Sequence, residues 1–155
     1  MTSQKDELTT DTSKFLILGS GSMARKELLG SVGLIPDKVE IPDVDESLVA
    51  DETPRQYVSR VAGLKASAIS CDRQAYLITA DTTITVGKRF LVKTSDEIRA
   101  EEYLRLLSGR RHSVFTAFCI KHNDLLILKL VKTILKMRSL TEEEIRAYIE
   151  SKEWV

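Results

Sequence analysis

Cysteine is scarce in this chain, and its two copies, Cys71 and Cys119, stand far apart. Neither belongs to a Cys-x-x-Cys pair or to a spacing typical of metal ligands, so the cysteines predict no structural metal site. We expect two reduced thiols in a cytoplasmic protein. The sequence does not decide whether the two cysteines form a disulfide, because spacing alone does not reveal the distance and orientation that the bond requires.

The chain also has no formal net charge, since 23 Lys and Arg balance 23 Asp and Glu. This balance argues against a broad surface for nucleic acid or membrane, but it leaves room for a local basic pocket. The most apolar run, residues 125–135, is too short to span a bilayer and contains Lys129 and Lys132. We therefore expect neither nucleic acid nor membrane as a partner.

A secretory signal peptide is also absent from the polar residues 1–13, which lack a basic region followed by an apolar one. We expect this segment to be a flexible leader, followed by one domain over residues 14–155. A chain of 155 residues with 43% hydrophobic and 30% charged residues is large enough for one substantial core.

The stretch Phe15–Leu29 is the most informative part of the sequence. It predicts a short buried strand (Phe15–Leu18), a turn of small residues (Gly19–Ser22) and a helix from Met23, with Arg25 near its start. Free N–H groups and the helix dipole at such a helix start favour an anion, and phosphate is the first candidate. The helix pattern also predicts that Leu28 and Leu29 face inward.

Three interpretations of this turn remain open. It is an ordinary strand–turn–helix packing unit, a phosphate-binding turn, or a dinucleotide fingerprint. Gly19-x-Gly21-x-x-Ala24 fits the last of these, with Glu40 at about the right distance for a ribose-binding acid. That fingerprint is weak without supporting motifs.

Two polar segments follow. Asp43-Val44-Asp45-Glu46 is either a solvated acidic turn or a cluster of carboxylates suited to Mg²⁺. Thr53, Pro54 and Gln56 then predict a capped helix start, and the helix continues to about Ser70. Lys65 lies late in this helix, where a lysine usually serves as a solvated C-terminal charge.

The predicted strand Tyr76–Ala80 ends at Asp81. An acid just past a strand end is either a catalytic group of an α/β fold or a turn-forming residue. Residues 83–86 and 89–92 predict a hairpin around Gly87, and Lys93 follows it directly.

The remaining chain predicts two helices around a strand pair. Thr94 and Glu97 predict a capping box that opens a helix ending near Gly109, and Thr141 with Glu144 predicts another for a helix to about Ser151. Residues 114–120 and 126–137 predict a long strand pair, with His122 exposed near its turn.

Six motifs in this order resemble the Maf family of nucleoside triphosphate pyrophosphatases. L-G-S-G-S-M-A-R-K-E-L-L is similar to the family's L-A-S-x-S-P-R-R-x-E-L-L, although Met23 and Ala24 replace a Pro and an Arg. The others are D-V-D-E, E-T-P-R-Q-Y-V-S-R-V-A-G-L-K-A, A-D-T-T and L-R-L-L-S-G-R-R-H-S-V-F-T, before a final L-T-E-E-E-I-R-A-Y-I. Together they span most of the chain.

The resemblance implies an α/β fold in which helices flank a twisted mixed sheet. It is akin to the inosine triphosphate pyrophosphatase architecture, with two lobes around a cleft. The implied reaction hydrolyses a nucleoside triphosphate to the monophosphate and pyrophosphate with Mg²⁺ or Mn²⁺. Asp81 would be the general base, Lys65 and Lys93 would hold phosphates, and Glu46 with Asp81 would bind the metal. His112 would be structural.

The resemblance also implies substrate contacts from Ser20, Ser22, Arg25 and Thr82. Thr82 matches the branch acting on dTTP and UTP, whereas Ala24 fits neither that branch nor the one acting on 7-methyl-GTP. Hydrolysis of 7-methyl-GTP, a non-catalytic role in septum formation and dinucleotide binding remain alternatives.

Family members continue into a K-A-G-x-Y-x-I-Q-G segment that this sequence does not contain, so it resembles a C-terminally shortened member. We expect the last helix to leave Ile145, Tyr148 and Ile149 partly uncovered, and such an apolar patch favours association. The resemblance also allows a homodimer.

Overall fold

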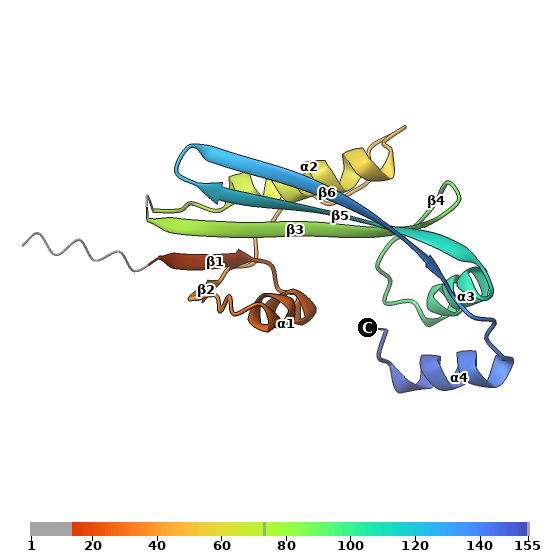
Figure 1. Ribbon diagram of the computed structural model, residues 1–155. Coiled ribbons are helices and arrows are strands. Elements are labelled where there is room, and N and C mark those ends of the chain that lie inside the picture. The colour runs from red at the N-terminus through yellow and green to blue at the C-terminus, as the bar shows by residue number, and fades with distance from the viewer. Residues whose placement is uncertain (1–13, 73, 155) are drawn as a thin grey trace, which may run out of the picture.

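The computed structural model describes residues 14–72 and 74–154, so the expected leader over residues 1–13 lies outside the described part. Within this part the chain forms one mixed sheet and four helices (Figure 1). The strands are β1 (Phe15–Gly19), β2 (Lys38–Val39), β3 (Ala75–Val86), β4 (Arg89–Leu91), β5 (Arg111–His122) and β6 (Leu125–Lys136). The helices are α1 (Met23–Ser31), α2 (Pro54–Ala68), α3 (Glu97–Leu107) and α4 (Glu142–Ser151).

The sheet has the strand order β2-β1-β3-β5-β6, with β4 paired to the far end of β3. β1 runs parallel to β2 and β3, whereas β3, β5 and β6 form an antiparallel ladder. The expected α/β fold with a twisted mixed sheet is therefore confirmed, and Figure 1 shows the twist along the three long strands.

The main core lies between α2 and the strands β3 and β5. Apolar residues recur along α2 at helical spacing, and Val58 and Val61 are fully buried against Leu77 and Ala117. The predicted capping box is confirmed: Thr53 Oγ1 accepts from the backbone N–H of Gln56, whose side chain accepts from the Thr53 N–H. This start fixes the helix so that its apolar face covers the sheet.

A second, smaller core joins α3 to α4. Ala100 on α3 is buried with Ile145 and Ile149 on α4, and Trp154 packs against them. The expectation of an uncovered α4 face is therefore wrong for Ile145 and Ile149, because α3 covers them. Only Tyr148 of that group is exposed, at 39%. The capping box from Thr141 to Glu144 is confirmed.

Helix α1 differs from its prediction. None of its residues is buried, and Leu28, expected to face inward, is 67% exposed, while Leu29 is half-buried. The helix lies beside the short strands β1 and β2 (Figure 1), which offer little surface for it to cover.

Two further local predictions are corrected. Asp96, not Thr94, caps α3: the Asp96 carboxylate accepts from Ile98 N, and Thr94 Oγ1 accepts from Asp96 N. His122, expected to be exposed, is half-buried, because its ring stacks on Tyr76 with centroids 4.0 Å apart. The hairpin around Gly87 and the long pair β5–β6 agree with the sequence, and Cys71 and Cys119 are both free thiols.

In the described part of the chain, no helix is both long and apolar enough to cross a membrane.

Candidate active site

The candidate site lies where β1 ends beside β3. On this edge of β3, β1 pairs as far as Gly19 opposite Thr79, and β4 pairs only from Ile84 onward. Residues 80–83 of β3 are therefore left between the two partners. The chain leaves β1 at this point and continues into a turn and the start of α1. Side chains from the turn and from α1 therefore lie next to residues 80–83 of β3.

The predicted end of a strand at Ala80 is wrong, because β3 continues through Asp81 to Val86. The antiparallel ladder with β5 runs along β3 from Leu77 to Thr85 and keeps the strand extended. Asp81 nevertheless lies just beyond the end of a parallel strand, since the strand that stops there is its neighbour β1.

Side chains alternate along β3, so Asp81 and Thr82 point to opposite faces of the sheet. Asp81 faces α2 and is 5% exposed. There the buried Lys65 lies between two carboxylates, with its Nζ 3.0 Å from Asp81 Oδ1 and 2.9 Å from Glu46 Oε1. Lys65 is 7% exposed, so it is not the solvated helix-end charge that its sequence position first favours.

The electrostatics of Asp81 are unusual for a carboxylate paired with a lysine. Burial raises the pKa of Asp81 above its usual value; the bond from Lys65 opposes this rise and the nearby Glu46 adds to it. Its second oxygen, Oδ2, is buried and has no hydrogen-bond partner in the described structure. A buried acceptor without a partner is costly, and such sites commonly mark functional groups.

On the opposite face, Thr82 meets the turn after β1. Arg25 NH1 donates to Ser20 Oγ over 2.9 Å, and Arg25 NH2 lies 3.4 Å from Thr82 Oγ1. Thr82 Oγ1 also lies 3.0 Å from Thr116 Oγ1 on β5. Ser22 stands at the N-cap of α1 without a side-chain capping bond, so its hydroxyl leaves the first N–H groups of the helix uncapped.

A cleft of about 1230 Å³ connects these groups. All predicted site residues line it: Ser20, Ser22, Arg25, Glu46, Lys65, Asp81, Thr82 and Lys93. Lys93, which follows β4, is exposed. The same cleft reaches the α3–α4 unit, where Tyr103, Tyr148 and Trp154 line it, so the cleft has a polar end and an aromatic end.

Glu46 and Asp81 supply the only pair of carboxylates that lines the cleft near Lys65 in the described structure. No group of three or more His, Cys, Asp or Glu able to hold a metal exists within residues 14–72 and 74–154. Mg²⁺ is often held by one or two carboxylates together with substrate phosphates. The donor set therefore fits a metal that arrives with a phosphate ligand, and Asp81 Oδ2 is an oxygen available to it.

The other two acids of the D-V-D-E segment do not join the site. Hydrogen bonding from the Ser47 side chain, together with the bond from the Ser47 backbone N–H, lowers the pKa of Asp45. Asp43 is exposed. The alternative of a solvated acidic turn therefore holds for these two residues, while Glu46 alone reaches Lys65.

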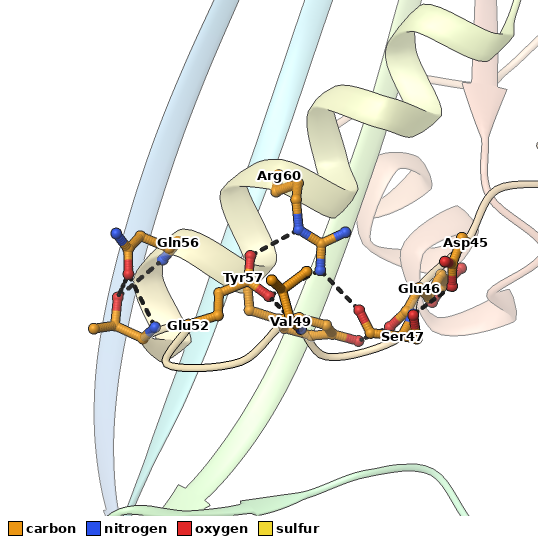
Figure 2. Close-up of polar contacts among 9 residues, drawn as sticks. Asp45, Glu46, Ser47, Val49, Glu52, Gln56, Tyr57 and Arg60 are labelled. Carbon is orange, nitrogen blue, oxygen red and sulfur yellow. Dashed lines mark hydrogen bonds and ion pairs between the residues drawn. The ribbon is translucent and has the colours of Figure 1, made fainter.

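Tyr57 is a site residue that the sequence alone did not reveal. Its ring belongs to the apolar face of α2, but its hydroxyl donates to the carbonyl of Glu46 over 3.0 Å, as Figure 2 shows. A tyrosine at a buried helix position requires a hydrogen-bond partner for its hydroxyl. The sequence therefore indicates that Tyr57 binds a polar group. Sequence spacing does not reveal which group that partner is.

Comparison with known proteins identifies relatives over most of the chain. The family model described as "Maf-like protein" matches residues 15–155. A dTTP/UTP pyrophosphatase from Roseobacter denitrificans is 43% identical over 138 residues, which are 89% of this chain and 73% of the relative. A nucleoside triphosphate pyrophosphatase from Anaplasma marginale is 40% identical over 141 residues, covering 90% of this chain and 72% of the relative.

Among solved structures, a HAM1 protein from Coxiella burnetii aligns with 78% of this chain and 71% of its own, with a TM-score of 0.49 and 14% sequence identity.

Proposed function

The chain belongs to the Maf-like family, and on this premise we propose that it is a nucleoside triphosphate pyrophosphatase. The proposed reaction hydrolyses the bond between the α- and β-phosphates and releases a nucleoside monophosphate and pyrophosphate. Relatives at 43% and 40% identity that carry such names support this reaction type.

One observation carries the proposal. Lys65 Nζ holds Asp81 Oδ1 at 3.0 Å while Asp81 Oδ2 stays buried and unpaired, in a cleft that also contains Ser20 and Arg25. A carboxylate with one fixed and one open oxygen is suited to take a proton from a water molecule. Its raised pKa brings its basicity closer to that required for proton transfer near neutral pH.

In this proposal Asp81 is the general base. Water oxygen forms a bond to phosphorus, the bridging phosphorus–oxygen bond breaks, and the water proton passes to Asp81 Oδ2. Lys65 keeps Asp81 Oδ1 occupied, so the open oxygen is the one directed at water. Positioning and charge neutralisation supply most of the rate enhancement in phosphoryl-type transfer.

The turn after β1 and the start of α1 would bind the phosphates. Arg25 supplies a guanidinium that Ser20 already orients, and Ser22 and the uncapped N–H groups of α1 supply further donors. Lys93 also lines the cleft and adds a positive charge. This combination of a helix N-terminus and a fixed arginine favours an anion.

Glu46 would hold Mg²⁺ or Mn²⁺ directly together with the substrate phosphates, and Asp81 would help to hold it through the water molecule that its Oδ2 contacts. The bound ion would neutralise negative charge on the phosphates during the reaction. Asp81 and Glu46 face the same lysine, so a change at either alters the charge balance of both.

We also propose a preference for dTTP and UTP over 7-methyl-GTP. Relatives from Roseobacter denitrificans and Ruegeria are named dTTP/UTP pyrophosphatases. Thr82, fixed by Thr116 and close to Arg25, is the residue of this chain that we connect with the preference.

The test is a panel of nucleoside triphosphates, 7-methyl-GTP included, each incubated with the chain and Mg²⁺ and scored for pyrophosphate against phosphate release. We expect pyrophosphate, with dTTP and UTP turned over fastest. Release of phosphate alone would contradict the pyrophosphatase assignment. A more than tenfold preference for 7-methyl-GTP over UTP would overturn the base preference while leaving the reaction type intact.

A further inference from the structure

The loop between β2 and α2 carries Glu46 but has little structure of its own. None of its residues 43–52 belongs to a helix or strand, and the Glu46 side chain is 49% exposed. Its carboxylate is nevertheless placed 2.9 Å from a lysine buried in the site. Something outside the Glu46 side chain must therefore hold the loop against α2.

Arg60 on α2 makes the contacts that do this, and Figure 2 shows them together. Its Nε and NH2 bind the two oxygens of Glu52 over 2.7 and 2.8 Å, a bidentate pair, and NH2 also donates to the carbonyl of Ser47 over 2.9 Å. The Glu52 carboxylate in turn accepts from the backbone N–H of Val49 over 3.3 Å. Arg60 thus connects the middle of the loop to its end.

Tyr57, one turn before Arg60, makes the second attachment. Its hydroxyl donates to the carbonyl of Glu46, and the Arg60 guanidinium lies 5.7 Å from the centre of its ring. Two consecutive loop carbonyls, those of Glu46 and Ser47, are therefore each bound to α2. Lys65 lies further along the same helix and binds the Glu46 side chain.

We propose that Arg60 is a positioning residue for Glu46. Arg60 acts by binding the carbonyl of Ser47, the residue after Glu46, and the carboxylate of Glu52 at the end of the loop. This inference rests on the proposed pyrophosphatase function, because it concerns the readiness of Glu46 for substrate phosphates and metal. Arg60 itself does not line the cleft as the described residues define it, so it acts through the loop.

The chemistry of the contact requires an arginine. The Glu52 side chain is 8% exposed, and the hydrogen bond from the Arg60 guanidinium lowers the pKa of Glu52, which favours the ionised pair. A lysine in place of Arg60 presents one compact charge and cannot bind both oxygens of Glu52 and the Ser47 carbonyl in one plane. Arg60→Lys is therefore expected to restore the function only in part.

The experiment combines turnover with a measurement on the loop itself. Arg60→Ala, Glu46→Gln and the double variant are compared with wild type for pyrophosphate release from dTTP over a range of Mg²⁺ concentrations. Amide hydrogen exchange at Ser47 and Val49 is measured without nucleotide. Arg55→Ala is the matched control, since Arg55 lies on the same helix but faces Phe115 rather than the loop.

We expect Arg60→Ala to lower kcat by about 10–100-fold, as loss of a supporting residue around a metal site commonly does, and to speed exchange at Val49. Adding Arg60→Ala to Glu46→Gln should lower kcat no further, because Arg60 acts through Glu46. Arg55→Ala should match wild type in both measurements. Wild-type turnover in Arg60→Ala, or losses that multiply in the double variant, would overturn the inference.

A substitute variant and the exchange measurement distinguish failure of this inference from failure of the proposed function. If Arg60→Ala does not fold, Arg60→Lys replaces it, because lysine keeps the positive charge but cannot bind both oxygens of Glu52 and the Ser47 carbonyl; faster exchange at Val49 and lower turnover than wild type are then expected. If wild type releases no pyrophosphate from any nucleotide, the proposed function fails. The exchange at Val49 then decides whether Arg60 holds the loop: faster exchange than in Arg55→Ala supports it, and equal exchange overturns it.

Discussion

A buried carboxylate that binds its lysine through only one oxygen is the most informative residue-scale feature of the protein. Asp81 is 5% exposed, and Lys65 occupies Oδ1 but leaves Oδ2 without a partner in the described structure. A purely structural ion pair in such surroundings would be expected to satisfy both oxygens, because an unpaired buried acceptor is unfavourable. The arrangement instead leaves one buried oxygen without a partner on a residue that lines the cleft.

The first prediction concerns this open oxygen. Asp81→Asn should abolish measurable pyrophosphate release while nucleotide binding is retained, because the amide keeps the shape but accepts no proton. Loss of a general base typically lowers kcat by ~10²–10⁴-fold. Turnover is measured by pyrophosphate release from dTTP and binding by calorimetry. Asp124→Asn, an exposed acid in the β5–β6 turn, is the control, and full turnover in Asp81→Asn would remove Asp81 from the mechanism.

The second prediction follows from the raised pKa of Asp81. A group whose pKa is higher in the folded than in the unfolded state contributes stability below the unfolded pKa, and this contribution is lost as pH rises through the folded pKa. Wild type should therefore lose stability relative to Asp81→Asn as pH rises from about 4, the usual value for Asp, toward neutrality. Activity should rise over the same interval, since the base must be ionised.

Thermal midpoints of both proteins, measured at intervals between these pH values, test this prediction. Their difference should change in favour of Asp81→Asn as pH increases. A difference that is constant with pH would mean that the attraction of Lys65 cancels the effect of burial on the pKa of Asp81. A change in favour of wild type would mean that the attraction of Lys65 outweighs burial.

At the scale of the elements, the site depends on where β1 ends. Gly19, its last residue, lies opposite Thr79, and a Cβ at this position would lie 2.6 Å from Thr79 Cγ2 and 2.8 Å from Ile69 Cδ1. Both neighbours are almost fully buried, so neither side chain can move aside easily. Glycine here lets the strand pack closely against β3 before the turn begins.

The third prediction is that Gly19→Ala lowers the free energy of unfolding by about 1–3 kcal/mol, the usual cost of overpacking a core. It should also reduce nucleotide binding, because the strain lies directly before Ser20. Gly30→Ala is the matched control: it lies in α1, where an added Cβ meets nothing within 4 Å. It should be neutral or stabilising by up to about 1 kcal/mol, since alanine favours helix. Urea unfolding measures both, and equal stabilities would contradict the packing argument.

At the scale of the whole molecule, the cleft lies between two units that have separate small cores. The sheet with α2 forms one, and α3 with α4 forms the other. The second unit is attached through the ends of β5 and β6, where Met137 N donates to the carbonyl of Arg110 over 3.0 Å. Within this unit, a bond from Leu140 N to Ser108 Oγ over 2.8 Å joins the end of α3 to the segment before α4. A nucleotide that binds Arg25 at one end and contacts Tyr148 or Trp154 at the other would connect both units.

The fourth prediction is that such a ligand stabilises the entire chain against heat. A non-hydrolysable α,β-imido analogue of dUTP at 100 times its Kd should add about 2.7 kcal/mol, a rise in Tm of about 2–4 °C for each kcal/mol. NAD and NADP should cause no shift. Scanning fluorimetry with each ligand and Mg²⁺ measures this, and protection by NAD instead of the analogue would favour the dinucleotide-binding alternative.

Much of this protein can be predicted from sequence alone, because local chemistry encodes it. The strand–turn–helix from Phe15, the capping boxes at Thr53 and Thr141 and the hairpin around Gly87 depend on neighbouring residues, and the structure confirms each. The order of motifs also identified the family. The residues expected in the site do line one cleft, although their individual roles remain predictions.

The tertiary structure decided what depends on contacts between distant segments. β3 continues past Asp81 because β5 pairs with it, α4 is covered because α3 packs on it, and Leu28 is exposed because little sheet surface lies beside α1. Glu46 differs from Asp43 and Asp45 in that its carboxylate contacts Lys65, while Tyr57 and Arg60 on α2 bind the backbone carbonyls of Glu46 and Ser47. Burial, and with it the direction of a pKa shift, arises when separate elements exclude water together, and no local pattern of residues specifies that.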